Sequence, residues 1–207
     1  MSKPLFARVA LIGIGLIGSS LARALRRDRL AGSIAACARP QETLDIVRRL
    51  NLADEVTLDP AVAVTGAELV VIAAPLSAYA ELARCMASAL APGAIVTDVG
   101  SVKEAAIREL KPLLPAGVHL VPGHPVAGTE HSGPEAGFAE LFRDRWCILT
   151  PLAKGDAQAL ERVTRSSATA SPPGSGVRMH QRSANISAKP LSGPECSVPA
   201  TGWAGTK

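Results

Sequence analysis

The sequence has few features that would indicate a metal site, a membrane span or a nucleic-acid interface. Its 207 residues include four cysteines, none in a CxxC pair or at metal-ligand spacing, so we expect no metal and a reduced, cytoplasmic compartment. No apolar run reaches the roughly 20 residues of a membrane helix, and the N-terminus does not resemble a signal peptide. Aromatic residues make up only 3%, and without aromatics among the basic residues we expect no nucleic-acid binding.

The formal net charge of +4 is concentrated at the C-terminal end. From Ser166 onward the chain is rich in Ser, Pro and Gly, shows no helical or strand periodicity, and carries a net charge of +3. Its charged residues are Arg178, Arg182, Lys189, Lys207 and Glu195. We therefore expect a folded region over 1–165 and a low-complexity, disordered tail over 166–207.

A glycine-rich segment near the start, Gly13-Ile14-Gly15-Leu16-Ile17-Gly18, follows the apolar run 8–12 and precedes helical spacing over 16–25. This strand–turn–helix context predicts a dinucleotide site. In such a site Gly13 permits the turn, Gly15 lets a pyrophosphate approach, Gly18 packs helix on strand, and the first helical residues, Leu16 and Ile17, offer N–H groups. The alternative is a glycine-rich turn in another α/β protein.

The second predicted strand, 33–38, is followed by Arg39, at the place where NAD-specific sites usually carry an acidic residue. A cation there suits the 2′-phosphate of NADP or stacks on adenine. We therefore expect NAD or NADP, with a slight preference for NADP. The alternative is that Arg39 is a solvated loop residue.

Strand-like runs at 69–74, 94–99 and 118–121 alternate with helical patterns at 41–51, 76–90 and 103–114. This alternation predicts an α/β, Rossmann-like, doubly wound and mostly parallel sheet. Functional residues are expected at the carboxyl ends of its strands, where Ala74-Pro75, Gly100-Ser101 and Gly123-His124 lie. Of these we expect Ala74 and Pro75 to bind the cofactor.

Two further motifs are Asp98-Val99-Gly100-Ser101-Val102-Lys103 and the segment from Gly123-His124-Pro125 to Gly133. Together they resemble the prephenate dehydrogenase family, which includes arogenate and cyclohexadienyl dehydrogenases. The resemblance runs from about Arg8 to about Pro151. It implies NAD(P)-dependent oxidative decarboxylation of prephenate to 4-hydroxyphenylpyruvate, or of arogenate to tyrosine.

The resemblance also implies roles for individual residues. His124 would take the proton of the substrate hydroxyl as hydride leaves, a task that suits the near-neutral pKa of histidine. Ser101 would orient hydroxyl and nicotinamide, and Thr129 and Glu130 would line the substrate entrance. The alternatives are a solvated loop histidine, a Ser101 that caps the next helix with Glu104, a solvated Glu130, and a surface position for Lys103.

Members of the family continue into a helical domain that forms the dimer and supplies substrate-binding cations, and none of its motifs is present here. The change of composition near Arg165 therefore indicates a truncated or frameshifted reading frame. Two hypotheses follow: an active tyrosine-pathway dehydrogenase, or a catalytically silent NAD(P)-binding remnant. A third, weaker one is a β-hydroxyacid or 6-phosphogluconate type dehydrogenase domain, which would not explain Gly123-His124-Pro125.

Overall fold

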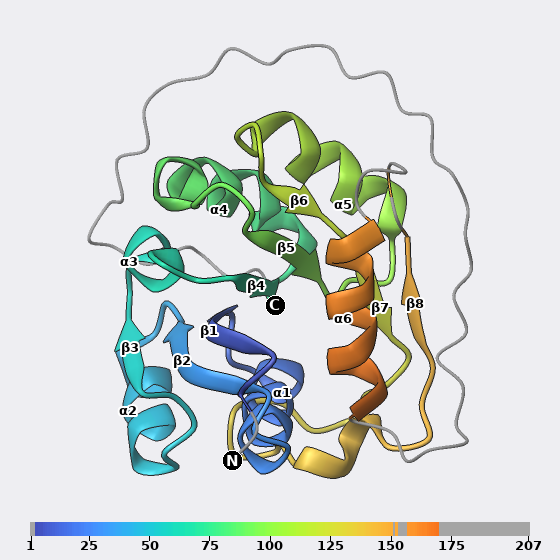
Figure 1. Cartoon of the computed structure of the whole chain (residues 1–207). Coiled ribbons are helices and arrows are strands. Elements are labelled where there is room, and N and C mark those ends of the chain that lie inside the picture. Colours follow the sequence, from blue (N-terminus) through green and yellow to red (C-terminus); the bar gives the residue numbers. More distant parts are fainter. Residues whose placement is uncertain (1–2, 151, 153–156, 170–207) are drawn as a thin grey trace.

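The computed structural model describes residues 3–150, 152 and 157–169, and it contains a parallel sheet of six strands (Figure 1). The strands lie in the order β3-β2-β1-β4-β5-β6, and every neighbouring pair is parallel. Their bounds are Phe6–Ile12 for β1, Ala31–Cys37 for β2, Glu55–Thr57 for β3, Leu69–Ile72 for β4, Ile95–Asp98 for β5 and His119–Leu120 for β6. The expected Rossmann-like α/β fold is confirmed.

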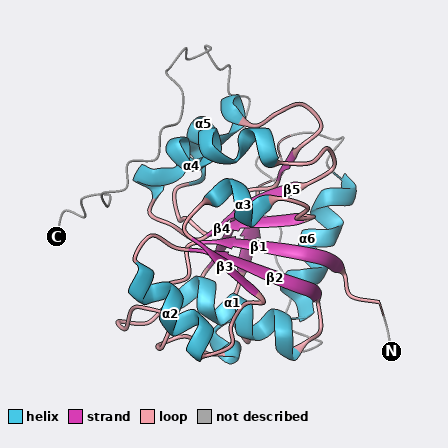
Figure 2. Ribbon diagram, turned by 90° about the vertical axis from the view of Figure 1, so that its left-hand side faces the viewer, coloured by secondary structure: helices cyan, strands magenta, loops and turns pink. Residues whose placement is uncertain are grey.

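Helices pack on both faces of this sheet (Figure 2). Their bounds are Leu16–Arg27 for α1, Gln41–Arg49 for α2, Pro60–Val64 for α3, Tyr79–Met86 for α4, Lys103–Leu110 for α5 and Ala157–Thr169 for α6. Short 3-10 turns flank some of them: η1 (Leu76–Ala78), η2 (Ala87–Ala89), η3 (Lys111–Leu113) and η4 (Ala139–Phe142). The helices expected over 76–90 and 103–114 are thus α-helical only in part.

Successive residues of the central strand β1 are buried on opposite faces of the sheet. Val9 and Leu11 belong to a core shared with α1, α2 and α6, whereas Ala10 and Ile12 belong to one shared with α3, α4 and α5. All four are fully buried or nearly so. A strand covered on both faces must be apolar throughout, which explains the continuous apolar runs in the sequence.

The order of the strands reverses direction between β1 and β4, which pair from Val9↔Leu69 to Ile12↔Ile72. At such a switch point the connections leave toward opposite faces, so a crevice opens beyond the carboxyl ends of the two strands. The glycine-rich turn after β1 and Ala74-Pro75 after β4 both lie at this edge. The fold therefore places the two expected cofactor segments side by side.

The second motif follows the strand expected over 118–121, but it also forms a strand of its own, which we had not predicted. Strand β6 stops at Leu120, and Gly123–Pro125 forms a separate strand, β7, that pairs antiparallel with β8 (Cys147–Leu149). His124 lies opposite Ile148 in this pair. The reason is a long-range pairing with residues more than twenty positions away, which local periodicity does not reveal.

Besides β7 and its partner β8, the sequence did not predict β3, α3 and α6. Helix α6 ends at Thr169, so residues 166–169, which we had placed in the disordered tail, are helical. Ala159 and Val163 of α6 are buried in the core that includes β1. The rest of the expected disordered tail, 170–207, lies outside the described residues.

Candidate functional site

The turn between β1 and α1 is closed tightly against β4. Gly13 has a φ of 97°, a left-handed conformation that favours glycine, and a Cβ there would lie 2.4 Å from the carbonyl oxygen of Ala73. A Cβ on Gly18 would lie 2.2 Å from the carbonyl oxygen of Gly13. Gly18 therefore packs on the turn itself, where we had expected the strand. Larger residues at either position would force the backbone apart.

The N-terminus of α1 is open to a ligand. Gly15 is the N-cap residue, no side chain caps the helix, and its first turn contains no acidic residue. A Cβ on Gly15 would have no atom within 4 Å. Free N–H groups and the positive end of the helix dipole favour an anion at this place.

Two hollows lie on either side of this turn. The Arg39 hollow, of about 300 Å³, is lined in part by Gly13, Gly15, Arg39, Ala74 and Pro75. The Ser101 hollow, of about 420 Å³, is lined in part by Gly15, Leu16, Ile17, Ala74, Pro75 and Ser101. Gly15, Ala74 and Pro75 belong to both, so the hollows adjoin at the N-terminus of α1. This arrangement suits an elongated ligand with an anionic centre and a ring system at each end.

Of the residues expected to bind the cofactor, all but Gly18 line one or both hollows. Arg39 is exposed at the end of β2, beside the buried Cys37, whose thiol pKa is raised to about 12 by burial. The Arg39 hollow also includes Gly133 and Pro134, which sequence reasoning missed. These two residues are more than a hundred positions from the glycine turn, so no local pattern could have linked them to it.

The segment that carries Gly133 and Pro134 is fastened to α1. The carbonyl oxygen of Pro134 accepts a hydrogen bond from Arg23, and the Ser20 hydroxyl accepts one from the Phe138 N–H. Further along, Leu141 and Phe142 of η4 pack against Leu16, Ile17 and Leu21. The loop that follows the second motif is therefore part of the wall around the turn.

Ser101 lies in the loop between β5 and α5, on the wall of the Ser101 hollow. The suggested capping role is wrong, because the N-cap of α5 is Val102 and no side chain caps the helix. With Val102 at the N-cap, Glu104 is one position too early to complete a capping box. The exposed Ser101 side chain is instead available to a ligand in the hollow.

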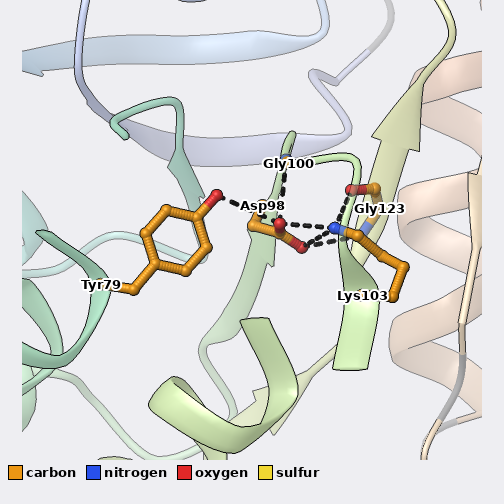
Figure 3. A network of polar contacts seen from close by, with 5 residues as sticks. All are labelled: Tyr79, Asp98, Gly100, Lys103 and Gly123. Atoms are coloured by element: carbon orange, nitrogen blue, oxygen red, sulfur yellow. Dashed lines mark hydrogen bonds and ion pairs between the residues drawn. The ribbon is translucent and has the colours of Figure 1, made fainter. Parts of the chain in front are cut away.

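His124 is half-buried in β7, and its Nδ1 is buried without a hydrogen-bond partner among the described residues. His124 lines neither hollow. Asp98 connects the residues that precede His124 and Ser101, because its carboxylate accepts hydrogen bonds from the N–H groups of Gly123 and Gly100 (Figure 3). Ser101 directly follows Gly100, and His124 directly follows Gly123. The N–H groups of both glycines are bound to the same carboxylate.

Lys103 is not the surface residue that the sequence allowed. Its Nζ lies 2.5 Å from Asp98 Oδ1, and its side chain is only 14% exposed. Burial lowers the pKa of Lys103, although the charge of Asp98 opposes this effect. Burial and the same carboxylate also raise the pKa of Tyr79, whose hydroxyl donates to Asp98. The sequence did not predict this polar cluster.

Thr129 and Glu130 are exposed and line neither hollow. The Thr129 hydroxyl accepts a hydrogen bond from the His131 N–H, and the Glu130 carboxylate lies 3.6 Å from His131 Nε2. The role of Thr129 and Glu130 in substrate entry stays a prediction.

Comparison with known proteins identifies the family of this chain. Residues 21–170 match the nucleotide-binding domain of prephenate dehydrogenase. The chain belongs to the prephenate dehydrogenase family. The match therefore favours this family over the weaker hypothesis of a β-hydroxyacid or 6-phosphogluconate type domain. Gly123-His124-Pro125 had indicated the same family.

Several members of the prephenate dehydrogenase family are similar to this chain. Cyclohexadienyl dehydrogenase of Zymomonas mobilis is 45% identical over 158 residues, which are 76% of this chain and 54% of that protein. Prephenate dehydrogenase of Aquifex aeolicus, crystallised with hydroxyphenyl propionate and NAD+, superposes with a TM-score of 0.75 at 29% identity, covering 88% and 61% of the two chains. Arogenate dehydrogenase of Synechocystis gives a TM-score of 0.72 at 30% identity, covering 85% and 59%.

The chain spans about half the length of the curated relatives that it matches. Within the described part of the chain, no group of three or more His, Cys, Asp and Glu side chains is placed to hold a metal ion. No helix in that part is long and apolar enough to cross a membrane.

Proposed function

We propose that this chain forms the cofactor-binding half of an NAD(P)-dependent dehydrogenase that decarboxylates prephenate to 4-hydroxyphenylpyruvate, or arogenate to tyrosine. The observation that carries this proposal is the Ser101 hollow, in which Ser101 and the N-terminus of α1 share one wall. The connection of His124 to the same loop through Asp98 supports it further.

The proposed cofactor is NAD or NADP, with its pyrophosphate at the N-terminus of α1, its adenosine in the Arg39 hollow and its nicotinamide in the Ser101 hollow. When bound, the nicotinamide supplies an acceptor for hydride. The NAD+ in the Aquifex aeolicus enzyme favours NAD for this chain. Only the exposed cation at Arg39 favours NADP, so both cofactors need to be tested.

In the proposed reaction the substrate carbon that bears the hydroxyl loses hydride, and the hydroxyl loses its proton to His124. We assign the proton to Nε2, because Nδ1 is buried. The bond to the ring carboxylate then breaks, carbon dioxide leaves, and the electron pair completes an aromatic ring. Ser101 orients the hydroxyl by a hydrogen bond. Since aromatisation drives the reaction, the protein has chiefly to position the reactants and accept one proton.

Thr129 and Glu130 complete the proposed site at the substrate entrance, beyond the hollows. A cytoplasmic location is part of the proposal, and so is dimer formation, which in the family depends on a helical domain. Both follow from the resemblance to enzymes of tyrosine biosynthesis.

The second candidate function is a module that binds NAD(P) without turnover. It is favoured by one observation: none of the described residues that line the Ser101 hollow is a lysine, an arginine or a histidine. Prephenate carries two carboxylates, which need cationic partners, and hydride transfer needs a site from which water is excluded.

The test is formation of NADH or NADPH, followed at 340 nm, with the full chain and prephenate or arogenate. The control variant is His131→Asn, which changes an exposed histidine of the same motif, and the test variant is His124→Asn. Turnover that is lost in His124→Asn and kept in His131→Asn supports the dehydrogenase. Cofactor binding without turnover supports the silent module, and a folded chain that binds neither cofactor contradicts both.

A further inference from the structure

The fully buried Asp98 carboxylate receives hydrogen bonds from four sides (Figure 3). The Tyr79 hydroxyl donates over 3.1 Å, the Gly100 N–H over 2.9 Å and the Gly123 N–H over 3.2 Å. Lys103 Nζ donates as well, at 2.5 Å from Oδ1. These donors come from α4, from the loop after β5, from β7 and from the start of α5. A single side chain thus connects four segments at the edge of the sheet.

Asp98 and Lys103 together hold both polar groups of Gly123. Its N–H donates to the Asp98 carboxylate, and its carbonyl oxygen accepts from Lys103 Nζ over 2.5 Å. A residue bound at both its N–H and its carbonyl oxygen can neither slide along its strand nor rotate about it. The position of Gly123 is therefore fixed from the main sheet, although β7 belongs to a separate sheet.

We propose that Lys103 and Asp98 are positioning residues that fix His124 and Ser101 relative to each other at the catalytic site. This inference rests on the proposed function, which makes those two residues the catalytic pair. The carboxylate binds Gly100, immediately before Ser101, and Gly123, immediately before His124. The Lys103 ammonium group binds the Asp98 carboxylate, which closes the loop 98–103. The same group also donates to the carbonyl oxygen of Gly123.

The packing around Gly123 leaves little room for adjustment. A Cβ on this glycine would lie 3.1 Å from the carbonyl oxygen of Asp98 and 3.3 Å from a methyl carbon of Leu149. Consecutive Cα atoms are about 3.8 Å apart, so any displacement of Gly123 is passed on to His124. Since a misplacement of about 1 Å can slow an enzyme by about a hundredfold, the clamp has a direct catalytic value.

A buried ion pair is suited to this purpose. Replacing such a pair by apolar residues is often neutral or stabilising, so stability alone does not explain a charged pair here. Four directed hydrogen bonds to one carboxylate define a geometry that apolar packing would leave less constrained. The pair is thus better explained by the positions of Ser101 and His124 than by the stability of the fold.

The test is the NMR spectrum of the His124 imidazole in the full chain, without cofactor or substrate. Lys103→Met removes the ammonium group and keeps an unbranched side chain that is one heavy atom shorter. Lys111→Met is the matched control, because it makes the same change at an exposed position just after α5. We expect the His124 ring signals to shift in Lys103→Met and to stay in place in Lys111→Met. Lys103→Arg, which keeps the charge, should restore them in part.

A second variant covers the case in which Lys103→Met does not fold because it leaves Asp98 unpaired. The double variant Lys103→Met/Asp98→Asn removes both charges and should fold, yet it still lacks the donor to the Gly123 carbonyl oxygen. Unchanged His124 signals in either folded variant would overturn the proposal. Because no ligand is present, this result does not depend on whether the chain binds NAD(P) or turns over substrate.

Discussion

Gly18 packs directly against Gly13, so that a Cβ on Gly18 would be only 2.2 Å from the Gly13 carbonyl oxygen. Gly15, between them, has open space where its Cβ would be. The three glycines of one motif thus meet different requirements. Gly13 and Gly18 let the turn close, and Gly15 keeps its outer surface free for a ligand.

We predict that Gly18→Ala mainly lowers the stability of the fold and that Gly15→Ala mainly weakens cofactor binding. Gly18→Ala should lower the free energy of unfolding by roughly 1–3 kcal/mol, because the backbone must move to relieve the overlap. Gly15→Ala should change it by less than about 0.5 kcal/mol, yet weaken cofactor binding about tenfold by occupying the approach to the helix N-terminus. Urea unfolding and calorimetry on both variants provide the check. Equal effects on stability would contradict this account of the turn.

Arg39 should control the choice between the two cofactors. Arg39→Asp places a carboxylate where it can accept the ribose hydroxyl of NAD and repel the 2′-phosphate of NADP. We expect the Kd for NADP+ to rise at least about tenfold, while the Kd for NAD+ stays the same or falls. Arg84→Asp, an exposed position on α4, is the control for the change of charge. If both cofactors weaken equally, Arg39 does not contact the ribose.

Helix α6 should stabilise the sheet through Arg162. Its guanidinium lies 4.5 Å from the centroid of the Phe6 ring, and it donates to Glu68 over 2.6 Å and to the Leu5 carbonyl oxygen over 3.0 Å. Arg162→Ala should reduce the free energy of unfolding by roughly 1–2 kcal/mol, the sum of a modest cation–π contact and a partly exposed ion pair. Thermal unfolding of this variant, with Arg84→Ala for comparison, tests the prediction. An unchanged Tm would show that α6 contributes little to the fold.

Glu68 should make the fold sensitive to acid. Burial raises the pKa of this carboxyl, but the hydrogen bond from the Ala7 N–H and the Arg162 guanidinium together bring it below its usual value. A carboxyl with a lowered pKa in the folded state stabilises above its unfolded pKa, and this contribution is lost as the pH falls through the folded pKa. We expect Glu68→Gln to lose less stability than the original chain between about pH 5 and pH 3. The difference should be below about 1 kcal/mol, because Glu68 is partly exposed. Parallel pH profiles for the two proteins would rule out this contribution.

The sequence predicted the strand, turn and helix around the glycine-rich segment well because every requirement there is local. The apolar strand, the three glycines and the amphipathic helix occupy one stretch, and the structure forms that stretch as expected. The placement of Arg39 and Ala74-Pro75 beside this turn was also predictable, since the ends of parallel strands gather at one edge of the sheet. Their role in cofactor binding stays a prediction.

The sequence could not predict the environments that depend on distant contacts. Lys103 could have been a surface lysine, and only the packing of β7 beside Asp98 makes it a buried partner. The strand pairing that places His124 opposite Ile148 could not be predicted either, because β7 has only three residues and therefore shows no strand periodicity. Ser101 satisfied the pattern of a capping box, but the helix begins one residue later than that pattern requires.

The most direct test of the account is a calorimetric titration of the full chain with NAD+ and with NADP+, repeated on Gly15→Ala. The account predicts saturable binding at one site that weakens about tenfold in the variant while the fold is retained. A folded chain that binds neither cofactor, or a Gly15→Ala variant that binds as tightly as the original, would contradict the proposal that the turn after β1 is the nucleotide site.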